Sequence, residues 1–224
     1  MRTLAGAYGL GRLLVVLAIG VCAPARAGGW QDTPDALQLE AVGDTLRMNG
    51  TPMTIRTFQS TQALEPLLLA VQANWERDPR HAPVVRTSMP NWIVLNQTVG
   101  ARHRSFQARQ NGARTEGFVA LTSPADTRAP VLALRMPPLV DAVQVVDSVD
   151  QGRVSQQIVA VSRRSAETTA AAFDQALKAE GWRRDVLKKQ GGTLRVSANR
   201  GGEQFDAILS AQKSGALVMI STVK

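Results

Sequence analysis

Cysteine, histidine and aromatic residues are scarce in this 224-residue sequence, which has one cysteine, two histidines and 4% aromatic residues. Cys22 lies in an N-terminal apolar stretch, so no disulfide is expected in the rest of the chain. His81 and His103 are far apart and lack the paired spacing of zinc ligands, so no metal site or cofactor is predicted. Compactness must therefore come from a hydrophobic core.

Long hydrophobic runs are also missing. The longest, LLVVLAIGV at residues 13–21, is shorter than the ~20 residues that span a bilayer. It follows Arg2 and Arg12 and precedes an A-x-A site ending at Ala27, a pattern typical of a signal peptide over residues 1–27. Valine precedes Cys22, where lipoprotein sites carry a small residue, so a lipoprotein is disfavoured. The mature chain is expected to be periplasmic or secreted, without a transmembrane segment.

The charge balance is basic. The formal net charge is +8, and removal of residues 1–27 takes away three arginines and no acid, which leaves +5. Such a charge favours contact with anionic surfaces, but it is equally typical of ordinary solubility.

Sequence motifs for catalysis are lacking as well. There is no G-x-S-x-G elbow, phosphate-binding loop or calcium loop. Ser221 and Lys224 read S-x-x-K, but they end the chain and no K-T-G accompanies them. Carboxylates at Glu76 and Asp78, and at positions 141, 147 and 150, leave acid–base hydrolysis open, because a sequence does not show their separation.

What the sequence does contain is an internal similarity. AVQANWERD at residues 70–78 aligns with ALKAEGWRRD at 176–185, so that Trp75 matches Trp182. Each copy follows two alternating apolar-polar segments joined by a turn signal, Asn49-Gly50 in the first and Gln151-Gly152 in the second. Three further strand patterns follow each copy, in which Phe106 matches Phe205 and Gly117 matches Gly215. We interpret this similarity as an internal duplication.

The predicted fold class is therefore α+β: two tandem duplicated units, each a ββαβββ antiparallel sheet with one helix packed on it, after a cleaved signal peptide. The helices are expected to start near Ala63, with Pro66 in the first turn, and at the N-cap Ser165, and Gly181 should end the second. The predicted boundaries are a signal peptide at 1–27, an extension at 28–37, units at 38–123 and 139–224, and a Pro-containing linker at 124–138. Residues 79–90 are expected to be a loop, and residues 131–136 look like a strand.

Two basic groups and two tryptophans are the candidate interaction residues: Arg102, His103, Arg104, Arg109 and Arg114 in the first unit, Arg183, Arg184, Lys188 and Lys189 after the second helix, and Trp75 and Trp182. The tryptophans are expected to pack in or beside the core, and they would serve as binding platforms only if both indoles were exposed. Trp92 is predicted to be a core residue.

The leading hypothesis is a non-enzymatic exported bacterial envelope protein, a binding or assembly module acting through sheet edges or the groove between the two repeats. One alternative is a secreted cell-wall hydrolase, which needs a pocket that gathers polar residues between the units. The other is a binder of an anionic envelope polymer, which needs both basic groups on one surface. Expected partners are another envelope protein or such a polymer, and an oligomer is compatible with the same surfaces. Nucleic acid is the weaker partner class because the chain is exported.

Overall fold

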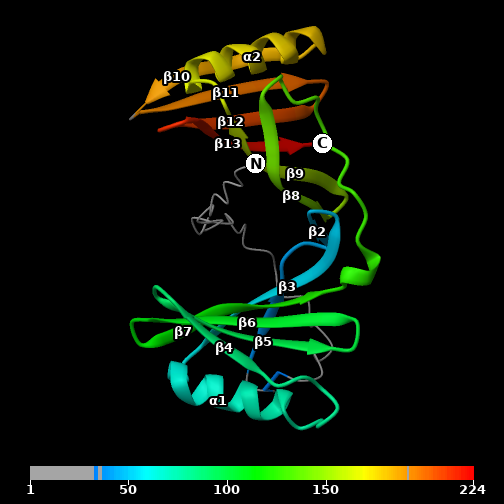
Figure 1. The fold of residues 1–224 in the computed structure, drawn as a ribbon, viewed down its shortest axis with the longest axis vertical. Coiled ribbons are helices and arrows are strands. Elements are labelled where there is room, and N and C mark those ends of the chain that lie inside the picture. The colour runs from blue at the N-terminus through cyan, green and yellow to red at the C-terminus, as the bar shows by residue number, and fades with distance from the viewer. Residues whose placement is uncertain (1–32, 35–36, 191) are drawn as a thin grey trace, which may run out of the picture.

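The computed structural model describes residues 33–34, 37–190 and 192–224 of the chain (Figure 1). The predicted signal peptide over residues 1–27 lies outside these residues. Within them, no helix is long and apolar enough to cross a membrane.

The N-terminal half of the fold contains one helix and seven strands. Its elements are β1 (Leu39–Ala41), β2 (Thr45–Met48), β3 (Thr51–Ser60), α1 (Leu64–Trp75), β4 (Val85–Met89), β5 (Trp92–Val99), β6 (Arg102–Asn111) and β7 (Arg114–Thr122). A short 3-10 turn, η1 (Pro124–Asp126), follows. Asn49 and Gly50 form the predicted hairpin turn with φ angles of 50° and 78°.

From β2 onward the N-terminal half has two strands, a helix and four strands, and the C-terminal half repeats this order. Its elements are β8 (Val140–Asp150), β9 (Arg153–Ser162), α2 (Ala166–Ala179), β10 (Arg183–Gln190), β11 (Thr193–Arg200), β12 (Glu203–Gln212) and β13 (Gly215–Val223). Ser165 is the N-cap of α2, as predicted, and its side chain accepts a hydrogen bond from the backbone N–H of Thr168. Gly181 follows the helix end with a φ of 81°.

The predicted fold class is wrong. The strands do not form two separate sheets in two α+β units but one 13-stranded sheet, in the order β10-β11-β12-β13-β9-β8-β2-β3-β7-β6-β5-β4 with β1 beside β3. Strands account for 55% of the described residues and helices for 15%, so the fold is mostly antiparallel sheet. The two halves join where β2 pairs with β8 over Thr45–Met48. This pairing gives the N–H and C=O groups on the free edge of β2 partners they would otherwise lack.

Three local predictions also need correction. Residues 79–90 contain strand β4, and the basic stretch after α2 is strand β10, so four strands rather than three follow each helix. Residues 131–136 form no strand. They lie over the C-terminal core with a bend at residues 133–134. Leu132, Leu134 and Met136 contact this core, and the side chain of Gln156 bonds to the backbone of residues 131 and 133.

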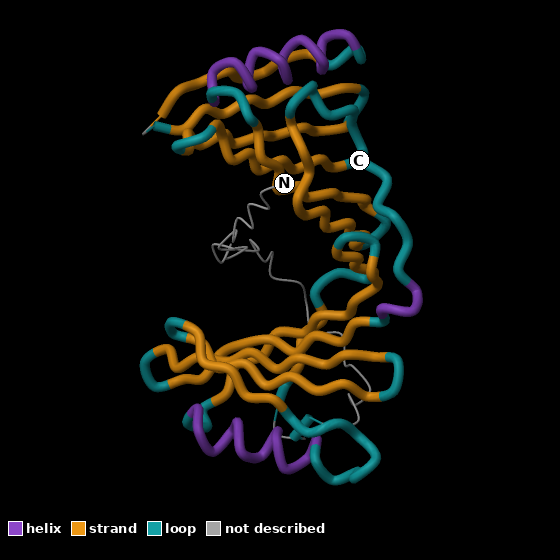
Figure 2. Tube along the Cα trace, viewed as in Figure 1, coloured by secondary structure: helices purple, strands orange, loops and turns teal. Residues whose placement is uncertain are grey.

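Both helices cover the same face of the sheet. Phe58 faces α1, and two-residue steps along β3 place Pro52 on that face. Pro52 pairs with Arg47, which pairs with Asp147 on β8. Val145 is two residues from Asp147 and therefore on the same face of β8, and it belongs to the core beneath α2. Figures 1 and 2 show the helices on the outside at opposite ends of the long axis. We call the opposite surface of the sheet the helix-free face.

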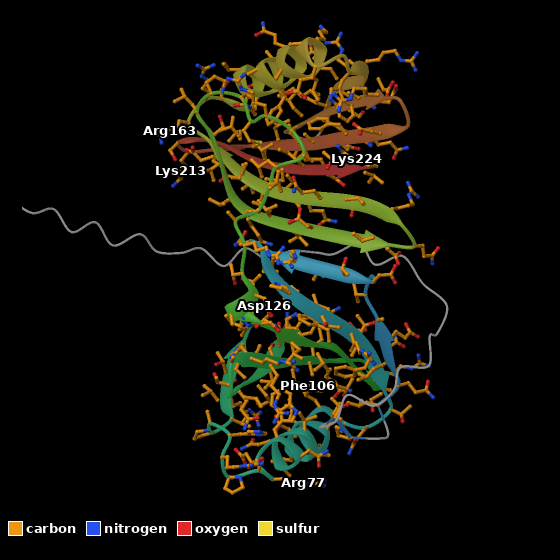
Figure 3. All side chains as sticks on the ribbon, turned by 90° about the vertical axis from the view of Figure 1, so that its right-hand side faces the viewer. Arg77, Phe106, Asp126, Arg163, Lys213 and Lys224 are labelled. Atoms are coloured by element: carbon orange, nitrogen blue, oxygen red, sulfur yellow. The ribbon has the colours of Figure 1, made fainter. Side chains whose placement is uncertain are left out.

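Each half has its own core between its helix and the sheet. In the N-terminal half, Leu67, Leu68 and Val71 of α1 pack on Phe58 and Phe106, whose rings stack at 4.8 Å. Figure 3 shows Phe106 inside this half. In the C-terminal half, α2 packs on a larger cluster centred on the second phenylalanine pair, Phe173 and Phe205.

Gly117 and Gly215, which the sequence alignment matched, occupy different places. Gly117 lies within β7 opposite Phe58, where a Cβ atom would meet the phenyl ring at 2.9 Å. Gly215 starts β13 with a φ of 135°. The first glycine makes room for an aromatic ring, whereas the second allows a turn that other residues rarely adopt.

Candidate functional site

The two aligned tryptophans are core residues. Trp75 is 1% exposed and Trp182 is 5% exposed, so neither indole offers a binding platform. An arginine guanidinium lies over each ring, that of Arg104 at 4.5 Å from Trp75 and that of Arg200 at 4.6 Å from Trp182.

Arg104 serves packing rather than binding. Its Nε donates to Gln97 Oε1 at 2.8 Å, and an Nη donates to the carbonyl of Trp75 at 3.2 Å. Gln97 in turn donates to the carbonyls of Trp75 and Ala82. This buried network fastens the end of α1 and the loop after it to the sheet.

The basic residues after α2 divide between the two faces. Arg184 pairs with Asp174 of α2 at 3.1 Å, and Lys189 pairs with Glu167 at 3.1 Å, both on the helix-covered face. Lys188 is paired in register with Arg195 and stands exposed on the helix-free face. Arg183 is also exposed.

The basic residues of the first unit are not a single cluster either. Arg109 lies over Trp92 at 4.9 Å and pairs with Glu116 at 2.5 Å on the helix-free face. Arg102 and Arg114 are exposed at opposite ends of the β6–β7 hairpin, and His103 is half-buried. Because β6 and β7 lie in one half and β10 is the far edge of the other, the structure does not bring the two basic groups together.

The prediction for Trp92 is wrong. Its ring lies on the helix-free face beside Phe118, with the ring centroids 5.9 Å apart, and it is partly exposed. The sequence suggested a core residue because an apolar stretch, Trp92 to Leu95, places apolar side chains on both faces of β5. Only one of these faces packs on the helix.

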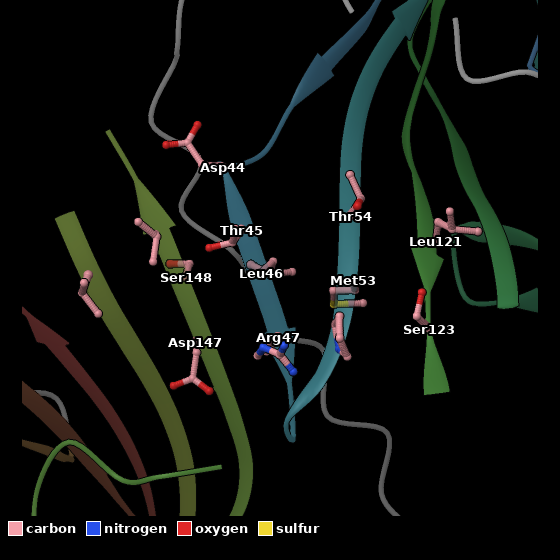
Figure 4. Close-up of a pocket in the computed structure, with 13 residues that line it drawn as sticks. Asp44, Thr45, Leu46, Arg47, Met53, Thr54, Leu121, Ser123, Asp147 and Ser148 are labelled. Carbon is pink, nitrogen blue, oxygen red and sulfur yellow. The ribbon is translucent and has the colours of Figure 1, made fainter. Parts of the chain in front are cut away.

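A depression of about 390 Å³ lies at the junction of the two halves, between β2, β3 and β8 (Figure 4). Its two carboxylates lie at opposite ends of the depression. Each has a partner: Asp44 accepts from the backbone N–H of Gln151 at 2.9 Å, and Asp147 accepts from Gln156 Nε2 at 2.6 Å. Ser123 and Ser148 also line the depression, but neither histidine of the chain does. The hydroxyl of Ser148 is hydrogen-bonded to that of Ser155 at 2.7 Å.

The ionisable groups likewise give no sign of acid–base catalysis. Among the described carboxyl groups, every resolved pKa shift is downward. The hydrogen bonds from Arg80 lower the pKa of Asp78, and that from Arg86 lowers the pKa of Glu65. A general acid needs the opposite shift. The described part of the chain also contains no cluster of residues able to hold a metal ion.

The most distinctive surface is on the helix-free face of the C-terminal half. We define the aliphatic patch as Val159, Val161, Ile208, Leu217 and Met219. Register places them side by side, with Ile208 opposite Met219, Met219 opposite Val159, and Leu217 opposite Val161. The exposed fractions are 41% for Val161 and 46% for both Ile208 and Met219, whereas Leu217 is half-buried and Val159 is 6% exposed.

The corresponding face of the N-terminal half is covered by its own side chains. Val94 and Ala120 are 7% and 6% exposed, although no helix lies over them. Trp92, Phe118 and the Arg109–Glu116 pair lie on the same surface and shield them. The C-terminal half has no aromatic residue on its helix-free face. Val161, Ile208 and Met219 stay open to solvent there, whereas Val159 is 6% exposed.

A sequence signal for the aliphatic patch exists. Residues 216–220 read ALVMI and residues 158–161 read IVAV, runs without the apolar-polar alternation of a half-exposed strand. Such runs are typical of strands covered on both faces.

No protein-family model, curated protein or solved structure matches this chain. What the molecule does must therefore be argued from its own surfaces.

Proposed function

We propose that the chain is a non-enzymatic binding or assembly protein of the bacterial cell envelope, and that its binding surface is the helix-free face of the sheet. Export is supported by the pattern of residues 1–27. Binding is supported by one observation above all, the aliphatic patch, in which Val161, Ile208 and Met219 are exposed beside the half-buried Leu217 and the buried Val159.

The patch supports binding because its exposure costs free energy in isolation. Apolar surface gains about 25 cal/mol for each Å² removed from water. Single exposed apolar residues are ordinary, but a contiguous group on one sheet face is typical of an interaction site. Here the group spans neighbouring positions on β9, β12 and β13, so a partner can cover it in one contact.

The alternatives receive less support. A cell-wall hydrolase needs paired polar groups between the halves, and the carboxylates of the junction depression are separated and already bonded. An anionic-polymer binder needs a continuous basic surface. Arg104 instead serves its core, Arg184 is paired with Asp174 of α2, and the remaining cations are divided between the two halves.

The test is capture of envelope components by residues 28–224 from the native host, with crosslinking, at low and high salt. Ile208→Lys places a charge in the patch and should abolish capture. Thr98→Lys adds the same charge to an exposed position on the helix-free face of β5 and should leave capture intact. Equal capture by both variants would reject the patch as the binding surface, and salt-sensitive recovery of acidic polymer alone would favour the polymer hypothesis.

A further inference from the structure

We infer that the partner covering the aliphatic patch is a second copy of this chain, packed face to face about a two-fold axis. This inference rests on the proposed function, because it names the occupant of the same surface.

The composition of the patch favours a homodimer. Interfaces between different proteins draw their affinity mainly from tryptophan, tyrosine and arginine, whereas obligate homodimer interfaces resemble a domain core cut in half. The patch has valine, isoleucine, leucine and methionine but no aromatic side chain. The backbone groups beneath it are already paired, because β9, β12 and β13 are interior strands. Its occupant must therefore offer aliphatic surface, and the patch itself is such a surface.

The charges around the patch are arranged for self-association. One register row crosses six strands in the order Lys188, Arg195, Ile208, Met219, Val159 and Gln144. Among the described residues, Lys188 on β10 is the unpaired cation of this row, since Arg195 is paired with Asp206, and the β8 end carries Gln144 and the nearby Asp141, which Arg163 contacts at 3.4 Å. A two-fold axis parallel to the strands, between β12 and β13, would place Ile208 on Met219 of the second copy. Each Lys188 would then lie opposite Gln144 of the other copy, with Asp141 of that copy nearby.

The face is also large enough. Six strands about 4.8 Å apart and about eight residues long, at roughly 3.3 Å per residue, present roughly 24 by 26 Å. That is about 600 Å² per copy, or about 1,200 Å² in total, which lies within the range of stable interfaces. Packed in this way, the two faces would form the aligned arrangement of a β-sandwich.

The sheet edges fit self-association less well. Edge strand β10 carries Lys188 and Lys189 and has a bulge between Arg184 and Val186. Lysines and bulges are the features by which edge strands resist pairing with other chains. The open face, rather than the β10 edge beside it, is therefore the site of contact.

The N-terminal half suggests a variant that should keep the fold. Ile208 and Met219 are paired in register three residues beyond Phe205, just as Arg109 and Glu116 are paired three residues beyond Phe106. The double substitution Ile208→Arg/Met219→Glu would thus place on β12 and β13 the kind of ion pair that β6 and β7 already accommodate.

Sedimentation velocity of residues 28–224 from about 1 to 100 µM is the test. We expect a dimer for the wild type and for Thr98→Lys, and at least a 100-fold higher dissociation constant for the double variant, since each change occurs twice in a two-fold interface. Unchanged circular dichroism and melting temperature would confirm that the variant is folded.

A wild type that stays monomeric throughout, or a double variant that still dimerises, would overturn the inference. Envelope capture separates this failure from that of the proposed function. A monomer that captures a different envelope protein through the patch would keep the proposed function and reject the second copy. A monomer that captures nothing would reject both.

Discussion

At the scale of single residues, each half places an arginine over the tryptophan near the end of its helix, but the arginine comes from a different strand in each half. Both tryptophans at the helix ends lie under an arginine that also donates to a helix-terminal carbonyl, that of Trp75 or that of Glu180. In the N-terminal half the arginine is on β6 and its register partner Gln97 is on β5. In the C-terminal half Arg200 is on β11 and its register partner is Glu203 on β12. Each half thus places a cation at the C-terminal end of its helix, where the helix dipole favours it, although a different strand supplies the cation.

Replacement of Arg104 by methionine should lower the free energy of unfolding by about 2–4 kcal/mol. The substitution leaves the buried oxygens of Gln97 and Trp75 without this donor. Arg102→Met, an exposed change on the same strand, should cost less than about 0.5 kcal/mol. Urea unfolding of the three proteins measures both values, and similar small losses would show that the network contributes little.

The carboxyl group of Glu116 should make the free energy of unfolding depend on pH. The side chains of Asn111 and then Arg109 hold its pKa below the ordinary value. An acid with a depressed folded-state pKa contributes its stabilisation above its unfolded value of about 4.3 and loses it as the pH falls through the folded pKa. Wild-type protein should therefore lose more unfolding free energy between about pH 5 and pH 3 than Glu116→Gln does. Parallel pH profiles would refute this role, and Glu40→Gln on β1 is the control.

Gly117 should tolerate no side chain. A Cβ atom there would overlap the carbonyl oxygen of Gln107 and press on the ring of Phe58. Gly117→Ala is therefore expected to cost about 1–3 kcal/mol or more, as overpacked cores do. Gly112→Ala, in an open turn with a φ of 60°, should cost no more than about 1 kcal/mol. Thermal melts of both variants compare the two sites.

At the scale of elements, the helices start in different ways. α2 has a side-chain cap from Ser165, whereas α1 has Ala63 at its N-cap and no side-chain cap there. The first N–H of α1, that of Leu64, donates instead to the side chain of Gln110 on β6, at 3.1 Å. A contact between residues 46 positions apart replaces the local cap.

Because of this difference, we expect substitutions at the two N-cap positions to change the free energy of unfolding by unequal amounts. Ser165→Ala should cost about 1 kcal/mol, because it removes the acceptor for the Thr168 N–H. Ala63→Ser should gain less than that amount, because Pro66 has no N–H to donate and the Leu64 N–H is already bonded. Urea unfolding gives both values, and a gain at Ala63 as large as the loss at Ser165 would contradict the explanation.

The elements that the sequence reveals are those with one clear buried face. The hairpin turns at Asn49 and Gln151, the first-turn position of Pro66 and the cap at Ser165 were all predictable from local chemistry. Strands β4 and β10 were not, because as edge strands they are almost wholly exposed and carry no apolar alternation. The aliphatic patch is not predictable for the opposite reason: the ALVMI run of β13 is typical of a strand covered on both faces, and the sequence does not show which face is left uncovered.

At the scale of the whole molecule, one short seam makes the two halves a single sheet. The β2–β8 pairing covers only four residue pairs, from Thr45 with Val149 to Met48 with Val146. It joins positions about 100 residues apart, so no local pattern indicates it, and this is why the fold-class prediction failed. A side-chain hydrogen bond closes each end of the seam. Val145 donates its N–H to Asn49 Oδ1 at 2.8 Å, and Gln151 donates to Asp44 Oδ2 at 2.9 Å.

Loss of both side-chain hydrogen bonds should make the β2–β8 seam open more often, without unfolding either half. In Asp44→Ala/Asn49→Gly, the glycine keeps the positive φ of the turn while both acceptors disappear. Two lost hydrogen bonds amount to about 1–3 kcal/mol, which is roughly a 5- to 150-fold change in local opening. Hydrogen exchange should accelerate by this factor at the amides of β2 and the facing residues of β8, while those of β6 and β12 stay protected. Asn91→Gly, the same change at another positive-φ asparagine, is the matched control. Equal acceleration in both halves would mean that the sheet opens only as a whole, and that the seam is as stable as the cores it connects.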